Sequence, residues 1–72
     1  MKKVESQKRF RNLLEKYLEV KGLDIILIME DGSEIELYKN RLLINDLIVT
    51  MNKHDEKRIP LAQITSVDLY AA

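Results

Sequence analysis

The sequence has no cysteine and no tryptophan, and only one histidine, one proline and two glycines among its 72 residues. The absence of cysteine excludes disulfide bonds, and a single histidine without cysteine argues against a structural zinc site. A domain this short buries only about 60% of the surface of its unfolded chain, so small domains usually add a disulfide, a metal or a partner subunit. Unless it packs unusually well, we therefore expect this chain to form an oligomer.

Long hydrophobic runs are absent as well. No apolar stretch approaches the roughly 20 residues of a membrane span, and Met1–Glu5 lead into no signal-peptide core. We therefore expect one cytoplasmic domain over residues 1–72, without a membrane partner. A content of 46% hydrophobic and 33% charged residues argues against disorder, and abundant Lys, Glu, Ile and Leu without Cys or Trp are typical of a thermophile.

The charges cancel, with 12 Lys and Arg against 12 Asp and Glu, which taken alone argues against a general nucleic-acid binder. Their distribution is uneven. Residues 1–22 hold seven basic and three acidic side chains, whereas residues 23–52 hold two basic and six acidic ones. Because a segregated basic segment attracts anionic partners, the N-terminal segment is a candidate binding surface.

Residues 6–21 have the spacing of an amphipathic helix. Apolar side chains recur at i, i+3, i+4, i+7 and i+8 from Phe10 to Leu18, which predicts one buried stripe that includes Leu13. Ser6 is a candidate N-cap, and Gly22 is a candidate stop signal.

The remainder, residues 23–70, has the pattern of short antiparallel strands. Residues 24–30 predict a strand buried on both faces, Asp31-Gly32 a tight hairpin turn, and residues 34–38 a strand that alternates between core and solvent. Pro60 is expected at a sheet edge or in a local turn, because it cannot donate to a central ladder. Further strands are predicted at 42–44, 47–51, 57–59 and 64–70, with a turn at Asn45-Asp46. One helix followed by five or six strands predicts a strongly bent sheet or small barrel.

Motifs for catalysis are absent. The sequence has no GxSxG, no P-loop and no GxGxxG. His54 could be a base or a ligand, but it lies in a charged loop and is expected to be exposed. The acids between Glu30 and Glu36 could hold a metal, but hairpin-tip acids are more often solvated. We therefore expect no enzyme, no cofactor, no metal and no small-molecule substrate.

Three segments resemble the Hfq branch of the Sm-like RNA-binding proteins. Gln7–Leu14 matches the Gln, Phe, Asn and Leu spacing of the Hfq helix, and Asp31-Gly32 stands where Hfq has Asn-Gly. Ile64–Val67 matches the segment after the Hfq Tyr-Lys-His motif. The resemblance implies a mainly β fold with one N-terminal helix and a five-stranded, strongly bent antiparallel sheet. It also implies a homohexameric ring that binds single-stranded U-rich RNA on the face bearing the helix, as an RNA chaperone or riboregulator.

The resemblance also assigns residues to that RNA site. Gln7 matches the glutamine of the uridine pocket, Leu47 stands at its stacking aromatic, and Asp46 stands at the adjoining glutamine. Pro60–Ala62 replace Tyr-Lys-His, so nearby basic residues at 57 and 58 are candidates to supply the missing charge. Ile28 and Glu34 replace residues of the A-rich distal face.

The residues themselves indicate the same surface. Lysine and arginine on one face can bind phosphates, and amide side chains can bind base edges. The candidate RNA-binding residues are Gln7, Lys8, Arg9, Arg11, Asn12, Lys16, Asp46, Leu47, Lys57 and Arg58. The alternative is a protein-interaction module, an adaptor or inhibitor, that pairs through its exposed strand edges without nucleic acid.

Overall fold

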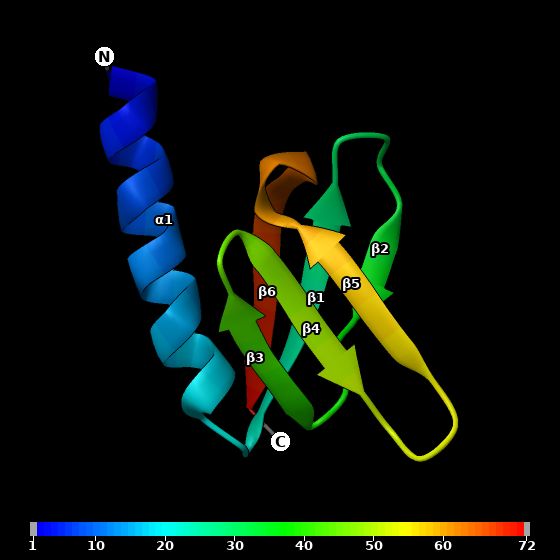
Figure 1. Cartoon of the computed structure of the whole chain (residues 1–72). Helices are drawn as coiled ribbons and strands as arrows, with labels where there is room; N and C mark the ends of the chain where they lie inside the picture. The colour runs from blue at the N-terminus through cyan, green and yellow to red at the C-terminus, as the bar shows by residue number, and fades with distance from the viewer. Residues whose placement is uncertain (1, 72) are drawn as a thin grey trace.

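The computed structural model describes the backbone of residues 2–71 and the side chains of residues 9–71. It is mainly β with one N-terminal helix, as predicted, and all of its strand pairs are antiparallel (Figure 1). The elements are α1 (Lys2–Glu19), β1 (Leu23–Met29), β2 (Glu34–Glu36), β3 (Asn40–Ile44), β4 (Leu47–Met51), β5 (Glu56–Pro60), a short 3-10 helix (Leu61–Gln63) and β6 (Ile64–Ala71).

The strands form two sheets of three, in the orders β2-β1-β6 and β3-β4-β5. The prediction of five strands in one bent sheet is therefore wrong in its count. The break lies between β2 and β3, where the Tyr38 N–H donates to the side-chain hydroxyl of Thr50 in β4, at 2.8 Å, and not to a backbone carbonyl. The same hydroxyl donates to the Asn40 carbonyl at 3.1 Å. Thr50 thus provides, from its side chain, the hydrogen bonds that a continuous ladder would supply.

Helix α1 begins at Lys2, four residues before the predicted start, so Ser6 lies inside the helix and is not its N-cap. Leu14 and Leu18 are buried, as their spacing predicts, whereas Leu13 is 49% exposed. The reason is that Leu13 lies at the flank of the apolar stripe, beyond the width that the sheets cover. No helix among residues 2–71 is long and apolar enough to cross a membrane.

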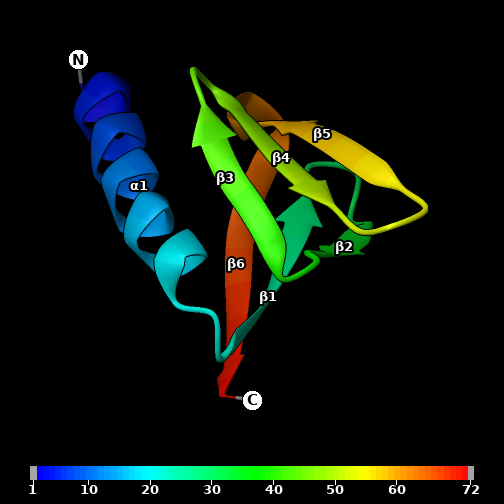
Figure 2. The same ribbon diagram turned by 60° about the horizontal axis from the view of Figure 1, so that its bottom comes forward.

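The core lies between the two sheets, with α1 packed along β3 at one side (Figure 2). Strand β1 is the centre of its sheet, but it buries only one face, because Ile26 and Ile28 are partly exposed. The prediction of a strand buried on both faces is therefore wrong. The buried apolar side chains of this core are Leu14, Leu18, Ile25, Leu27, Met29, Leu37, Ile48 and Ile59.

Two predicted turns are confirmed. Gly32 has a φ of +88° in the β1–β2 hairpin, a conformation that glycine adopts without strain. Asp31 closes this turn by accepting hydrogen bonds from the N–H and hydroxyl of Ser33. Asn45 takes the left-handed conformation, with a φ of 54°, in the turn between β3 and β4.

Pro60 ends β5, which pairs only with β4, so its predicted position on an edge strand is confirmed.

Candidate nucleic-acid interface

Arg11 connects the helix to the β3–β4 turn. Its Nη2 donates to the Asn45 carbonyl at 2.9 Å, and its Nε lies 3.5 Å from Asp46 Oδ1. The side chain of Arg11 is 40% exposed and that of Asp46 is 84% exposed. Two residues predicted for RNA binding are therefore neighbours, and they carry opposite charges.

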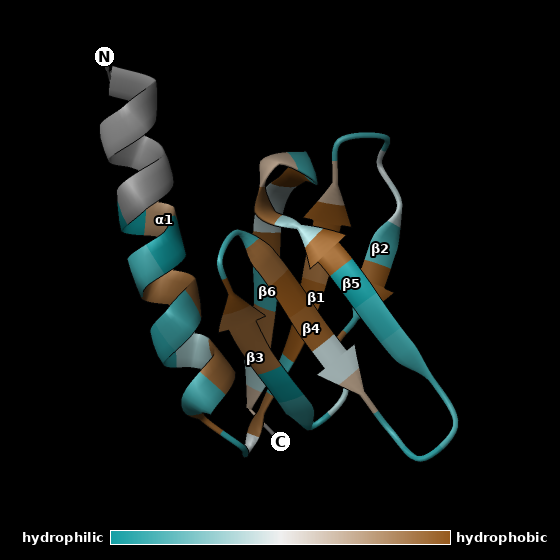
Figure 3. Cartoon of the chain, viewed as in Figure 1, coloured by the Kyte–Doolittle hydropathy of each residue, from teal (hydrophilic) through white to brown (hydrophobic). Residues whose placement is uncertain are grey.

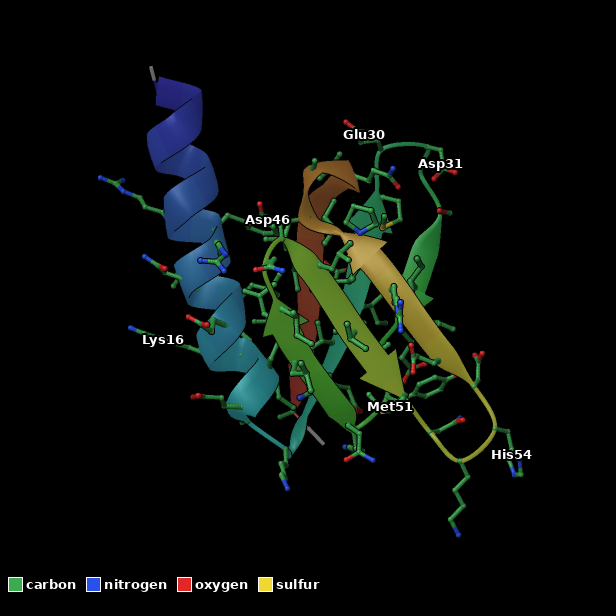
Figure 4. The ribbon with its side chains drawn as sticks, viewed as in Figure 1. Lys16, Glu30, Asp31, Asp46, Met51 and His54 are labelled. Carbon is green, nitrogen blue, oxygen red and sulfur yellow. The ribbon has the colours of Figure 1, made fainter. Side chains whose placement is uncertain are left out.

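The same turn meets the end of β5. The Leu61 N–H donates to the Asp46 carbonyl at 2.9 Å, and Leu47 stands opposite Pro60 in the strand register. We call Arg11, Asp46, Leu47, Pro60 and Leu61 the turn cluster. Three segments that are distant in sequence thus meet at one end of β4, beside α1 (Figure 4).

The outer side of α1 carries three more of the predicted residues. Arg9, Asn12 and Lys16 are all exposed, and Lys16 points away from both sheets (Figure 4). Arg9 and Lys16 are two helical turns apart, a spacing that keeps them on one side of the helix. The predicted contacts of Gln7 and Lys8 lie outside the described side chains.

Lys57 and Arg58 do not join the turn cluster. Lys57 stands opposite Thr50 and Arg58 stands opposite Val49. These positions on β4 are three and two residues after Leu47, the residue of β4 that belongs to the turn cluster. The Lys57 ammonium lies 5.1 Å from the centroid of the Tyr38 ring, and Arg58 Nε lies 2.8 Å from a carboxylate oxygen of Glu56. The structure therefore gives both cations partners of their own, away from the helix.

The outer face of β2-β1-β6 is acidic. In the strand register Ile26 lies between Glu36 and Asp68, and Ile28 lies between Glu34 and Ser66. The three acidic side chains are exposed. We call Ile26, Ile28, Glu34, Glu36 and Asp68 the acidic face. Negative charge on this face disfavours contact with a phosphate backbone.

The outer face of β3 and β4 carries exposed apolar side chains, which the sequence analysis did not predict. Leu42, Ile44 and Leu47 are 42%, 50% and 37% exposed, and their register places them on one face with Met51. We call these four residues the apolar face. Figure 3 shows β3 and β4 as largely hydrophobic ribbons. The sequence signal for this surface was that apolar residues occupy successive positions of these strands. Successive side chains point to opposite faces of a sheet, and only one face of this sheet can lie against the core.

Two buried polar side chains, Arg41 and Thr50, were not predicted either. Arg41 is 8% exposed, and its guanidinium donates to the carbonyls of Leu18, Val20 and Leu23 at 2.6–3.2 Å. Burial lowers the pKa of Arg41, and the charge of Asp24 partly opposes that shift. Arg41 therefore satisfies carbonyls at the end of α1 and the start of β1, which have no helical partner.

The residues considered for catalysis lie at the periphery. His54 is exposed in the β4–β5 loop, at the far end of β4 from Asp46 (Figure 4). Hydrogen bonds from the side chain and backbone of Ser33 lower the pKa of Asp31 in the β1–β2 hairpin. Among the described side chains, no group of three or more His, Asp or Glu residues is placed to hold a metal ion.

Comparison with protein-family models, with curated proteins and with solved structures finds no match to this chain.

Proposed function

We propose that this chain is an Hfq-like member of the Sm-like family that assembles as a homohexameric ring. The ring binds single-stranded, U-rich RNA on the face bearing the helix, as an RNA chaperone or riboregulator. The observation that carries this proposal is the turn cluster. The helix segment, the Asn45-Asp46 turn and the segment at Pro60 are the parts that the resemblance assigns to one RNA site, and they meet through Arg11 and Leu61.

The strand order also supports the proposal. Strands β2 and β3 are consecutive and are separated only by residues 37–39, at the Thr50 hydrogen bonds. Counted as the two halves of one bent strand, they leave five antiparallel strands after an N-terminal helix, which is the number in the Sm-like fold.

The open edges of β5 and β6 fit assembly by strand pairing. The Leu37 N–H donates to the Ile25 carbonyl, so the peptide groups of Ile25 point toward β2 and those of Ile26 point toward β6. Asp68 is the partner of Ile26 in β6, so the peptide groups of Asp68 point toward β1. The N–H of the next residue, Leu69, therefore points to the outer edge of β6. Such an edge pairs readily with another chain.

Substitution Leu69→Pro tests the edge directly. Proline removes the outward donor and leaves the β1–β6 ladder intact, so we expect the oligomer to dissociate while circular dichroism retains its strand signal. Leu69→Ala keeps the N–H and is the matched control. An oligomer that is unchanged by the proline would show that β6 is not the subunit contact.

Salt dependence tests the RNA site. We expect binding of a labelled uridine oligonucleotide to weaken as salt rises, because bound phosphates release counterions. Lys16→Gln removes one cation from the helix and should reduce the slope of log affinity against log salt by about one. Lys53→Gln, in the exposed β4–β5 loop, is the control and should leave the slope unchanged. Affinity that does not fall with salt would contradict the proposal.

The apolar face favours a second candidate, a protein-interaction module without nucleic acid. Exposed Leu42 and Ile44 on a sheet face are typical of a surface that another protein covers. Affinity capture from native lysate separates the two functions. Recovery of one stoichiometric protein that survives RNase treatment, without bound RNA, would favour this candidate.

A further inference from the structure

Asp46 has a fixed backbone and an exposed carboxylate. Its carbonyl accepts the Leu61 N–H at 2.9 Å, and the preceding carbonyl, of Asn45, accepts from Arg11 at 2.9 Å. Its side chain is nevertheless 84% exposed. The structure therefore presents a carboxylate to solvent from a turn that is held on both sides.

The guanidinium of Arg11 lies beside this carboxylate and has the opposite hydrogen-bonding character. A carboxylate only accepts hydrogen bonds and has two oxygens, whereas a guanidinium only donates and has five N–H groups. The contact with Arg11 uses one oxygen of Asp46, at 3.5 Å. A ligand that meets both side chains therefore needs donors next to an acceptor along one edge.

The nucleobases differ in whether they meet this need. Proteins read the exposed edges of single-stranded bases by hydrogen bonds. Guanine carries two adjacent donors, N1–H and the N2 amino group, followed by the O6 acceptor. Uracil carries one donor between two carbonyl oxygens, and a carboxylate repels both oxygens. Adenine and cytosine carry one amino donor next to an acceptor, so they offer the carboxylate one hydrogen-bonding group where guanine offers two.

We infer that the Arg11–Asp46 pair makes the RNA site select guanine over the other bases at the position it contacts. This inference rests on the proposed function, which places RNA at the turn cluster. Asp46 accepts from guanine N1–H and N2–H, and Arg11 donates to O6. Leu47, which is 37% exposed, and the neighbouring Pro60 offer the base an apolar surface. The preferred ligand is then a uridine-rich strand that contains guanosine.

The test compares four labelled oligonucleotides by fluorescence anisotropy. One contains only uridine, and the others carry a single guanosine, adenosine or cytidine at its centre. We expect the guanosine strand to bind about tenfold more tightly than the uridine strand, the size of effect that a two-point base contact gives. Adenosine and cytidine should bring no comparable gain.

Two variants with the same charge change locate the effect. Asp46→Asn replaces one acceptor oxygen by a donor, so it should abolish the preference for guanosine while the uridine strand still binds. Asp68→Asn, on the acidic face, should keep the preference. Equal affinity of the wild type for all four strands would overturn the inference alone, as would a preference that survives Asp46→Asn. Failure of every strand to bind would overturn the proposed function and the inference with it.

Discussion

The two sheets of this molecule have the same number of strands but different distributions of polar groups. Sheet β2-β1-β6 carries its charges outside, on the acidic face, and its inner face is apolar. Sheet β3-β4-β5 exposes the apolar face and buries Arg41 and Thr50, which are the buried polar side chains among residues 9–71. The first sheet thus follows the usual pattern of a half-solvated sheet. The second departs from it, because it buries two polar side chains beside Ile48 and Ile59 and exposes apolar side chains on β3 and β4.

The difference indicates which sheet depends on other parts of the molecule. Buried polar groups stabilise a fold only when they are hydrogen-bonded, so the second sheet requires its contacts to α1 and to the β2–β3 break. An exposed apolar surface is typically covered by a partner. We therefore expect substitutions in the second sheet to cost more than matched substitutions in the first.

The largest effect is expected for Arg41→Met. It removes the guanidinium that donates to the carbonyls of Leu18, Val20 and Leu23, of which Val20 keeps a backbone donor, the Leu23 N–H. We expect a loss of about 3 kcal/mol in the free energy of unfolding. Urea unfolding at fixed protein concentration measures it. Lys39→Met is the control, because the exposed ion pair of Lys39 with Asp24 should contribute less than about 1 kcal/mol. Equal losses for the two variants would contradict this role of Arg41.

The same substitution, threonine to valine, can be made once in each sheet, and the two losses of stability can be compared. Thr50→Val removes the buried hydroxyl that accepts the Tyr38 N–H, and we expect a loss of about 2 kcal/mol, because a part-buried donor is left unsatisfied. Thr65→Val, in β6, removes an exposed hydroxyl that donates to the Ile28 carbonyl and should cost less than about 1 kcal/mol. Thermal unfolding of the two variants under the same conditions measures both losses. A larger loss for Thr65→Val than for Thr50→Val would contradict the expectation that the second sheet is the more sensitive one.

The smallest effect is expected at the break between the sheets. The Tyr38 hydroxyl donates to Asp55 at 2.8 Å, and this hydrogen bond, with lesser effects of desolvation and of the Asp55 charge, raises the pKa of Tyr38 above its usual value. A raised pKa in the folded state means that the interaction stabilises the fold below the usual pKa of tyrosine, near 10, and is lost as pH rises through the raised value.

Titration of tyrosine by NMR measures this shift. Asp55→Asn should return the pKa of Tyr38 toward its usual value. A Tyr38 pKa that does not change in Asp55→Asn would show that the hydrogen bond is not its cause.

The sequence predicted those features that depend on local patterns. The core positions Leu14 and Leu18, the turns at Gly32 and Asn45 and the edge position of Pro60 follow from spacing or from backbone preference. These are properties of a few adjacent residues.

The remaining features depend on contacts between distant segments. Arg41 stands in a run of strand residues, and only its carbonyl partners, 18–23 positions earlier, explain its burial. The break at Tyr38 likewise requires Thr50, twelve residues later. In the candidate site, Arg11 and Asp46 were both selected from the sequence, but their ion pair could not be foreseen from the pattern of either segment.

The solution mass of the purified chain is the most direct test of the proposed ring. Multi-angle light scattering should give six chains of 8.5 kDa, about 51 kDa together. A stable mass of 8.5 kDa would contradict the ring, because it is the mass of a single chain. The edges of β5 and β6 would then be unpaired with another subunit in solution.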